Sequence, residues 1–111
     1  MQLSQEEIKE GVVKIILSGR MDMQGVEAIK GPFEDAVKDT SGSLIVDMSD
    51  VPYMSSIGIR CLLINAKSVK KRGGQYFIAA PQNEVKSVLE MSGIDQIIAV
   101  YDSFDLALSN I

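Results

Sequence analysis

The sequence of 111 residues contains no histidine, no tryptophan and a single cysteine, Cys61. Without histidine, the chain has neither the commonest general base nor the commonest metal ligand. A lone cysteine can form neither a disulfide within the chain nor a multi-cysteine metal site. These absences exclude histidine-based catalysis and the usual zinc sites, and we expect neither a metal nor a cofactor.

Positive charge and long apolar stretches are also scarce. Eleven basic residues stand against fifteen acidic ones, for a net charge of -4, whereas proteins that bind nucleic acid need clustered positive charge. No apolar run approaches the ~20 residues of a membrane helix. The N-terminus has neither the basic start nor the apolar stretch of a signal peptide. We therefore expect a cytoplasmic protein that binds neither nucleic acid nor membrane.

The motifs of nucleotide-binding enzymes are missing as well. The sequence has no Gly-x-x-x-x-Gly-Lys-Ser/Thr loop and no Gly-x-Gly-x-x-Gly after a predicted strand. No set of acid, base and nucleophile is visible, so we do not expect an enzyme. Asp47 and Asp50 could in principle bind magnesium, but two carboxylates near a strand end are usually solvated loop residues.

What the sequence does contain is typical of one globular domain over residues 1–111. Apolar residues make up 46% and charged residues 23%, and no linker or repeat interrupts the chain. Short β-branched runs predict strands over 12–17, 44–46, 76–79 and 97–100, and we expect a short partner strand around Ile8.

Between these strands, apolar residues recur at the spacing of helices. Gly31 and Pro32 interrupt the first helical pattern and should loosen, kink or break that helix. The second helix should end at Gly73. A third helix should follow Pro81 and end at Gly93. Asp102 can cap a short last helix. Strands that alternate with helices predict an α/β domain with a largely parallel or mixed sheet.

Ser55 and Ser56 lie where a buried strand gives way to the second helix, an edge at which α/β sheets usually meet ligands and partners. One interpretation is that both serines cap the helix by accepting hydrogen bonds from its free N–H groups. The other is that the site is phosphorylated, because a helix N-terminus tolerates a phosphate that adds about -1.5 to -2 charges. Gly58 would then keep the helix start bare, so that a partner could approach the backbone closely.

Four motifs spread over nearly the whole chain resemble those of STAS domains, and more narrowly those of stand-alone bacterial anti-sigma factor antagonists. They are the segment 46–63 around the serine pair, Leu17-Ser18-Gly19-Arg20-Met21-Asp22, Lys71-Arg72-Gly73-Gly74, and Leu89-Glu90-Met91-Ser92-Gly93-Ile94. The resemblance implies the STAS fold, an α/β fold in which about four α-helices pack on a mixed central β-sheet.

The resemblance also implies a partner-switching function. Members of the family bind an anti-sigma factor that is also a serine kinase of the GHKL type, and so free the sigma factor. The kinase phosphorylates the antagonist at the start of the second helix, and a serine phosphatase restores it. Matched to this motif, Ser56 is the phosphoacceptor. Ser55, which stands where many members carry Asp, is the second choice.

We expect the docking surface around this serine to be acidic and apolar. Its expected residues are Asp22, Asp50, Tyr53, Met54, Ser55, Ile57 and Gly58. Tyr53, Met54 and Ile57 could equally be core residues, and for Met54 the core is the favoured interpretation.

Three alternatives stay open. Asp47, at the end of an apolar strand, is placed like the phosphoacceptor of a receiver domain, but the acidic pair and the lysine that receivers need are missing. A STAS domain can also be a scaffold that never switches, or bind a small ligand at the same helix N-terminus. The sequence predicts no particular oligomeric state.

Overall fold

The computed structural model describes residues 1–111 as a five-stranded sheet with four α-helices. The strands follow one another across the sheet: β1 (Gln2–Lys9), β2 (Val12–Ser18), β3 (Ser43–Asp50), β4 (Tyr76–Ala79) and β5 (Ala99–Tyr101). The helices are α1 (Met23–Asp39), α2 (Ser56–Lys71), α3 (Asn83–Ser92) and α4 (Phe104–Ser109), and a short 3-10 helix covers Ile94–Gln96. No helix combines the length and the apolarity that crossing a bilayer requires.

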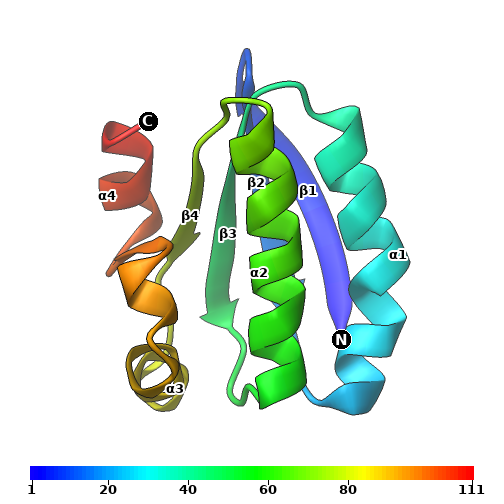
Figure 1. The fold of residues 1–111 in the computed structure, drawn as a ribbon, viewed down its shortest axis with the longest axis vertical. Helices are drawn as coiled ribbons and strands as arrows, with labels where there is room; N and C mark the ends of the chain where they lie inside the picture. Colours follow the sequence, from blue (N-terminus) through cyan, green and yellow to red (C-terminus); the bar gives the residue numbers. More distant parts are fainter.

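The sheet is mixed, as predicted. β1 is antiparallel to β2, whereas the other neighbouring pairs are parallel. A tight turn suffices for the antiparallel pair, and Gly11 occupies it with a φ of +80°. Parallel neighbours need longer crossovers, which α1, α2 and α3 provide. β2 leads into α1 and β3 leads into α2, and the two helices lie side by side on one face of the sheet (Figure 1). The C-terminal ends of the two strands and the starts of the two helices are therefore close together.

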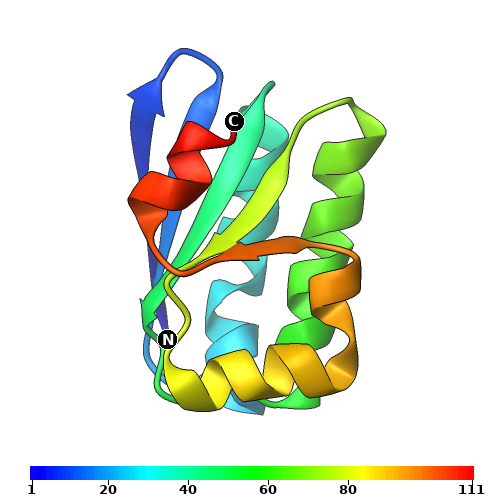
Figure 2. The same cartoon turned by 90° about the vertical axis from the view of Figure 1, so that its left-hand side faces the viewer.

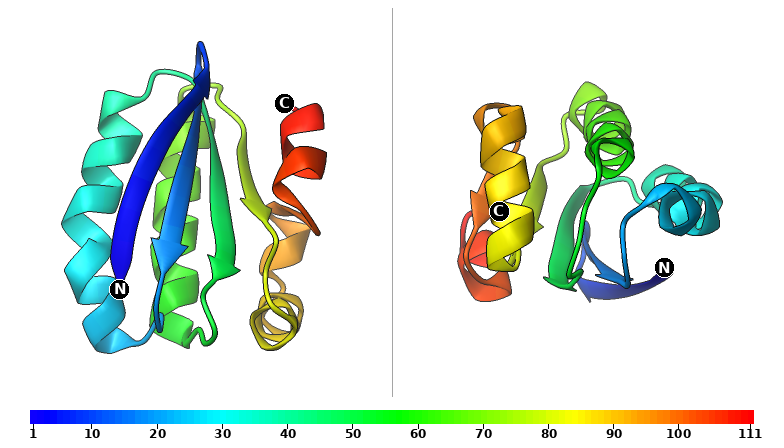
Figure 3. Two further views of the ribbon diagram at one scale, coloured as in Figure 1. Left: turned by 180° about the vertical axis from the view of Figure 1, so that it is seen from behind. Right: turned by 90° about the horizontal axis from the view of Figure 1, so that it is seen from below.

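Alternate residues of each strand feed two separate apolar clusters. The larger cluster contains 23 buried residues, including Ile15 of β2, Val46 of β3 and Phe33 of α1. The smaller one joins Val12 of β2, Ile45 of β3 and Ala79 of β4 to Ala107 of α4. α4 lies on the face of the sheet opposite α1 and α2 (Figure 2; Figure 3). Each fully buried large apolar side chain stabilises the fold by about 1.5–3 kcal/mol. The layer under α1 and α2 therefore contributes most of the core.

α1 does not break at Gly31 and Pro32, contrary to the prediction. One helix of 17 residues runs through both positions. Both residues are exposed, while Ile29 and Phe33 on the other face are buried. The carbonyl of Ala28, which proline cannot pair with, lies on that exposed side and can bind water. Packing of the buried face therefore outweighs the one lost hydrogen bond.

Several boundaries also differ from the prediction. β3, expected over 44–46, spans Ser43–Asp50. β1, expected as a short strand around Ile8, spans eight residues. The last strand begins at Ala99 rather than at residue 97, because the 3-10 helix runs to Gln96 and Ile97 is its C-cap residue. Ser103, and not Asp102, caps α4: its Oγ accepts from the backbone N–H of Leu106 at 3.1 Å. The Asp102 carboxylate pairs instead with Lys86 Nζ at 2.9 Å.

Gly31→Ala should change the free energy of unfolding by less than about 1 kcal/mol, because the helix propensity gained over glycine is offset by crowding of the new Cβ against the ring of Pro32. Apart from its chain neighbours and the backbone of its own helix, a Cβ at this position would meet no atom within 4 Å. Gly25→Ala in the same helix is the matched control, because its Cβ would collide with the Arg20 carbonyl oxygen and stability should fall. Urea denaturation measures both variants, and a loss of stability in Gly31→Ala as large as that in Gly25→Ala would contradict the open, exposed position of residue 31.

Candidate functional site

The turn between β2 and α1 lies beside the loop between β3 and α2, and backbone hydrogen bonds join them. Met21 and Met54 form an isolated parallel bridge. The N–H of Met21 donates to the Tyr53 carbonyl at 2.8 Å, and the N–H of Ser55 donates to the Met21 carbonyl at 3.0 Å. The start of α1 and the start of α2 are therefore fixed relative to each other at this edge of the sheet.

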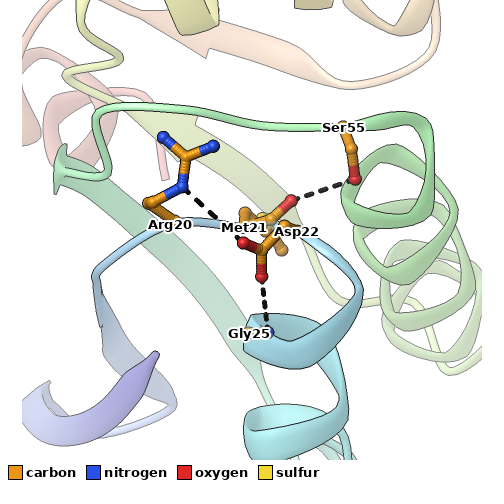
Figure 4. Close-up of polar contacts among 5 residues, drawn as sticks. All are labelled: Arg20, Met21, Asp22, Gly25 and Ser55. Atoms are coloured by element: carbon orange, nitrogen blue, oxygen red, sulfur yellow. Dashed lines mark hydrogen bonds and ion pairs between the residues drawn. The ribbon is translucent and has the colours of Figure 1, made fainter.

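Asp22 is the N-cap residue of α1. One carboxylate oxygen accepts from the Gly25 N–H at 2.8 Å, and the other lies 3.6 Å from Arg20 Nε (Figure 4). The hydrogen bond from Gly25, with help from the Arg20 charge, lowers the pKa of Asp22 below its ordinary value of 3.8. Asp22 thus brings a fixed negative charge to the surface, where 40% of its side chain is exposed.

Arg20 adds a positive charge that the sequence interpretation missed. Its guanidinium lies over the ring of Tyr53, 4.2 Å from the ring centre, while its Nε faces Asp22. Tyr53 is 38% exposed, so this stack of charge on aromatic ring is part of the surface. The expected acidic and apolar surface is therefore mixed in charge. The only signal in the sequence was that Arg20 stands two residues before Asp22 within one of the family-like motifs.

The two adjacent serines differ in their surroundings. Ser55 is the N-cap residue of α2 by position, but no N–H of the first turn donates to its side chain. Its Oγ donates instead to the Met21 carbonyl at 3.1 Å (Figure 4). The predicted capping role is therefore wrong for Ser55, whose hydroxyl connects α2 to the β2–α1 turn. Ser56 is the first residue of α2 and is exposed.

Met54 and Gly58 face the core rather than the surface. Met54 is 2% exposed, which confirms its interpretation as a core residue and removes it from a docking surface. A Cβ at Gly58 would lie 2.7 Å from Met54 Cγ and 2.8 Å from Met21 Cγ. The expectation that Gly58 leaves the backbone open to a partner is therefore wrong. The missing side chain makes room for the two methionines beneath the bridge.

The carboxylates of β3 have partners within the protein. Asp50 is exposed and accepts from Ser18 Oγ at 2.6 Å. Asp47 is nearly buried, accepts from the Ser49 N–H at 2.8 Å and lies 3.4 Å from Lys14 Nζ. No group of three potential metal ligands occurs anywhere in the structure. Asp47 and Asp50 thus serve local structure, and Asp50 also contributes negative charge to the surface near the β2–α1 turn.

Ile57 connects this edge to a groove between α1 and α2. The groove has a volume of about 270 Å³, and its lining includes Ile57 and Arg60 of α2 and Met23 of α1. Met23 is 69% exposed, and Ile64 further along α2 is 50% exposed. A groove with both apolar and charged lining residues therefore begins next to Ser56.

Comparisons with known proteins find relatives along nearly the whole chain. Residues 5–107 match the model of the STAS domain family. The anti-sigma F factor antagonist of Paenibacillus polymyxa is 24% identical over 102 residues, which are 91% of this chain and 87% of that protein.

Solved structures share the fold. An anti-sigma factor antagonist from Mycobacterium paratuberculosis superposes with a TM-score of 0.89 at 23% identity, over 99% of this chain and 92% of that chain. SpoIIAA in its unphosphorylated form gives 0.81 at 20% identity, over 98% and 95%. The phosphorylated form of SpoIIAA from Bacillus gives 0.73 at 19% identity, over 98% of both chains.

Asp22→Ala should destabilise the protein at neutral pH, and the difference from wild type should shrink as the pH falls. A carboxylate whose pKa is lowered by folding stabilises the fold above its ordinary value of 3.8 and loses this effect as it becomes protonated below that value. Thermal denaturation between pH 7 and pH 3 measures the difference. Asp35→Ala, which removes an exposed carboxylate elsewhere on α1, controls for loss of charge. A difference independent of pH would contradict the capping role.

Proposed function

Because the chain belongs to the STAS domain family, we propose that it is an anti-sigma factor antagonist, a regulator rather than an enzyme. In this proposal, unphosphorylated protein binds an anti-sigma factor that is also a serine kinase of the GHKL type. Phosphorylation of Ser56 by that kinase dissociates the complex, and removal of the phosphate by a serine phosphatase restores binding. Relatives support the proposal: one is an anti-sigma F factor antagonist, and SpoIIAA has structures in both phosphorylation states.

The observation that carries this proposal is the position of Ser56. It is an exposed first residue of α2, at the edge where Asp22 and Tyr53 are also accessible. Ser55 is only partly exposed, and its hydroxyl proton is already donated to the Met21 carbonyl. A kinase needs a hydroxyl that it can reach and deprotonate, and this favours Ser56 over Ser55.

The proposed docking surface surrounds Ser56 and rests on buried residues. We assign to it Arg20, Asp22, Asp50, Tyr53 and Ile57, each of which is at least partly exposed. Met54 and Gly58 support it from below. Because Ser56 lies outside the core, its modification can change the surface and leave the fold as it is.

The size of the effect is sufficient for a switch. A phosphate adds about -1.5 to -2 charges, and these must lose water or meet acidic groups when a partner docks. A loss of about 3 kcal/mol in binding free energy lowers the affinity roughly a hundredfold. A partner whose affinity falls by this factor would be replaced by a competing partner present at a similar concentration.

Ser56→Asp should lose most of the binding to the kinase while its thermal midpoint stays close to that of wild type. Ser56→Ala should still bind the kinase but should not be phosphorylated, whereas Ser55→Ala should still be phosphorylated. Affinity capture from a lysate of the native host, followed by mass spectrometry, identifies the kinase. Titration of the purified pair then measures the affinity, and an assay with labelled ATP measures phosphorylation.

Two results would contradict the switch. Equal binding of the kinase by wild type and Ser56→Asp would favour a scaffold that does not switch. A large fall in the thermal midpoint of Ser56→Asp would leave Ser56 with a structural role at the helix start.

A further inference from the structure

Arg60 is an unpaired cation close to Ser56. The two are residues i and i+4 of α2, and both are exposed. Side chains at this spacing lie on the same helical face, with Cβ atoms about 5–6 Å apart. The three ion pairs of the structure join Lys14 to Asp47, Arg20 to Asp22 and Lys86 to Asp102, and so leave Arg60 out. Its guanidinium is therefore available to a new acceptor on this face.

The other basic residues near Ser56 are less well placed. Arg20 is paired with Asp22 and stacked on Tyr53, and Figure 4 shows its guanidinium on the far side of Met21 from Ser55. The next basic residue along α2 is Lys67, about two turns beyond Arg60. Arg60 is thus the only basic residue of α2 within about one helical turn of position 56.

Charged groups of α1 face Arg60 across the groove. Glu27, Lys30 and Glu34 line the groove together with Arg60. Neither glutamate forms an ion pair with Arg60 in the unmodified protein. A phosphate dianion on Ser56 would carry more charge than either carboxylate, and it would be held on the same helix as Arg60.

This inference rests on the proposed phosphorylation of Ser56: we propose that Arg60 receives the phosphate. The guanidinium donates two N–H hydrogen bonds to phosphate oxygens and so closes a clamp over the first turn of α2. Phosphorylation then has a second effect besides adding charge. It neutralises the one free positive charge that α2 contributes to the groove, next to the exposed Met23. Phosphorylation therefore changes the charge of the surface at the edge of the sheet and the charge of the groove at the same time.

The test uses the full chain with phosphoserine installed at position 56 during translation, so that no kinase is needed. The pH titration of the phosphate, followed by phosphorus NMR, is compared between wild type and Arg60→Gln. A nearby guanidinium favours the dianion, so the pKa of the phosphate should be lower in wild type by about 0.3 pH units. Arg60→Lys should retain part of this shift, because it keeps the charge but loses the planar fork.

The thermal midpoint provides a second measurement. Among phosphorylated proteins, Arg60→Gln should melt about 2–3 °C below wild type, whereas the unmodified pair should differ little. Lys67→Gln removes the same charge from α2 beyond reach of position 56 and should leave the titration of the phosphate unchanged.

Two results would overturn the clamp: equal titration midpoints in wild type and Arg60→Gln, or an equal change in Lys67→Gln. Because phosphoserine is supplied directly, failure here is distinct from failure of the kinase to modify Ser56. That second failure is detected only by the phosphorylation assay proposed above.

Discussion

The short parallel bridge between Met21 and Met54 is the constraint on which the surface depends. Its backbone bonds join two crossover connections that are more than thirty residues apart in the sequence. Both methionine side chains are buried, and they fit only because Gly58 presents no Cβ. Neither connection can therefore shift without opening the core, and the residues above the bridge are held in one arrangement.

A rigid platform of this kind explains how one modification could control binding without refolding. Asp22 is oriented by the first turn of α1, and Arg20 by its contacts with Asp22 and Tyr53. A partner that docks on these groups needs little further ordering of the surface, which lowers the entropic cost of association. For the same reason the surface cannot rearrange to absorb an added charge. The added charge therefore lowers the stability of the complex with the partner rather than the stability of the fold.

Local patterns in the sequence predicted what depends on local structure. β4 occupies the predicted residues 76–79, and Gly93 ends α3 with a φ of +79°. The incorrect predictions lie where contacts with residues distant in the sequence, or with solvent, determine the structure. Pro32 is tolerated because its side of α1 faces water, and Gly58 faces two methionines from other segments. The candidate site was predicted at the strand ends, where the structure brings the β2–α1 turn beside the β3–α2 loop, but the stack of Arg20 on Tyr53 depends on the assembled fold.

The serine pair shows how one substitution can redistribute roles within a shared motif. Many members of the family carry aspartate where this chain has Ser55. At neutral pH an aspartate carboxylate has no proton to donate, so it cannot replace the Ser55 hydroxyl on the Met21 carbonyl. An aspartate would have to turn toward the N–H groups of α2, which a serine here leaves uncapped. In this chain, Ser55 thus tethers the helix to the neighbouring turn, and the surface carries one negative charge fewer. A phosphate on Ser56 would then supply the negative charge that the helix start lacks.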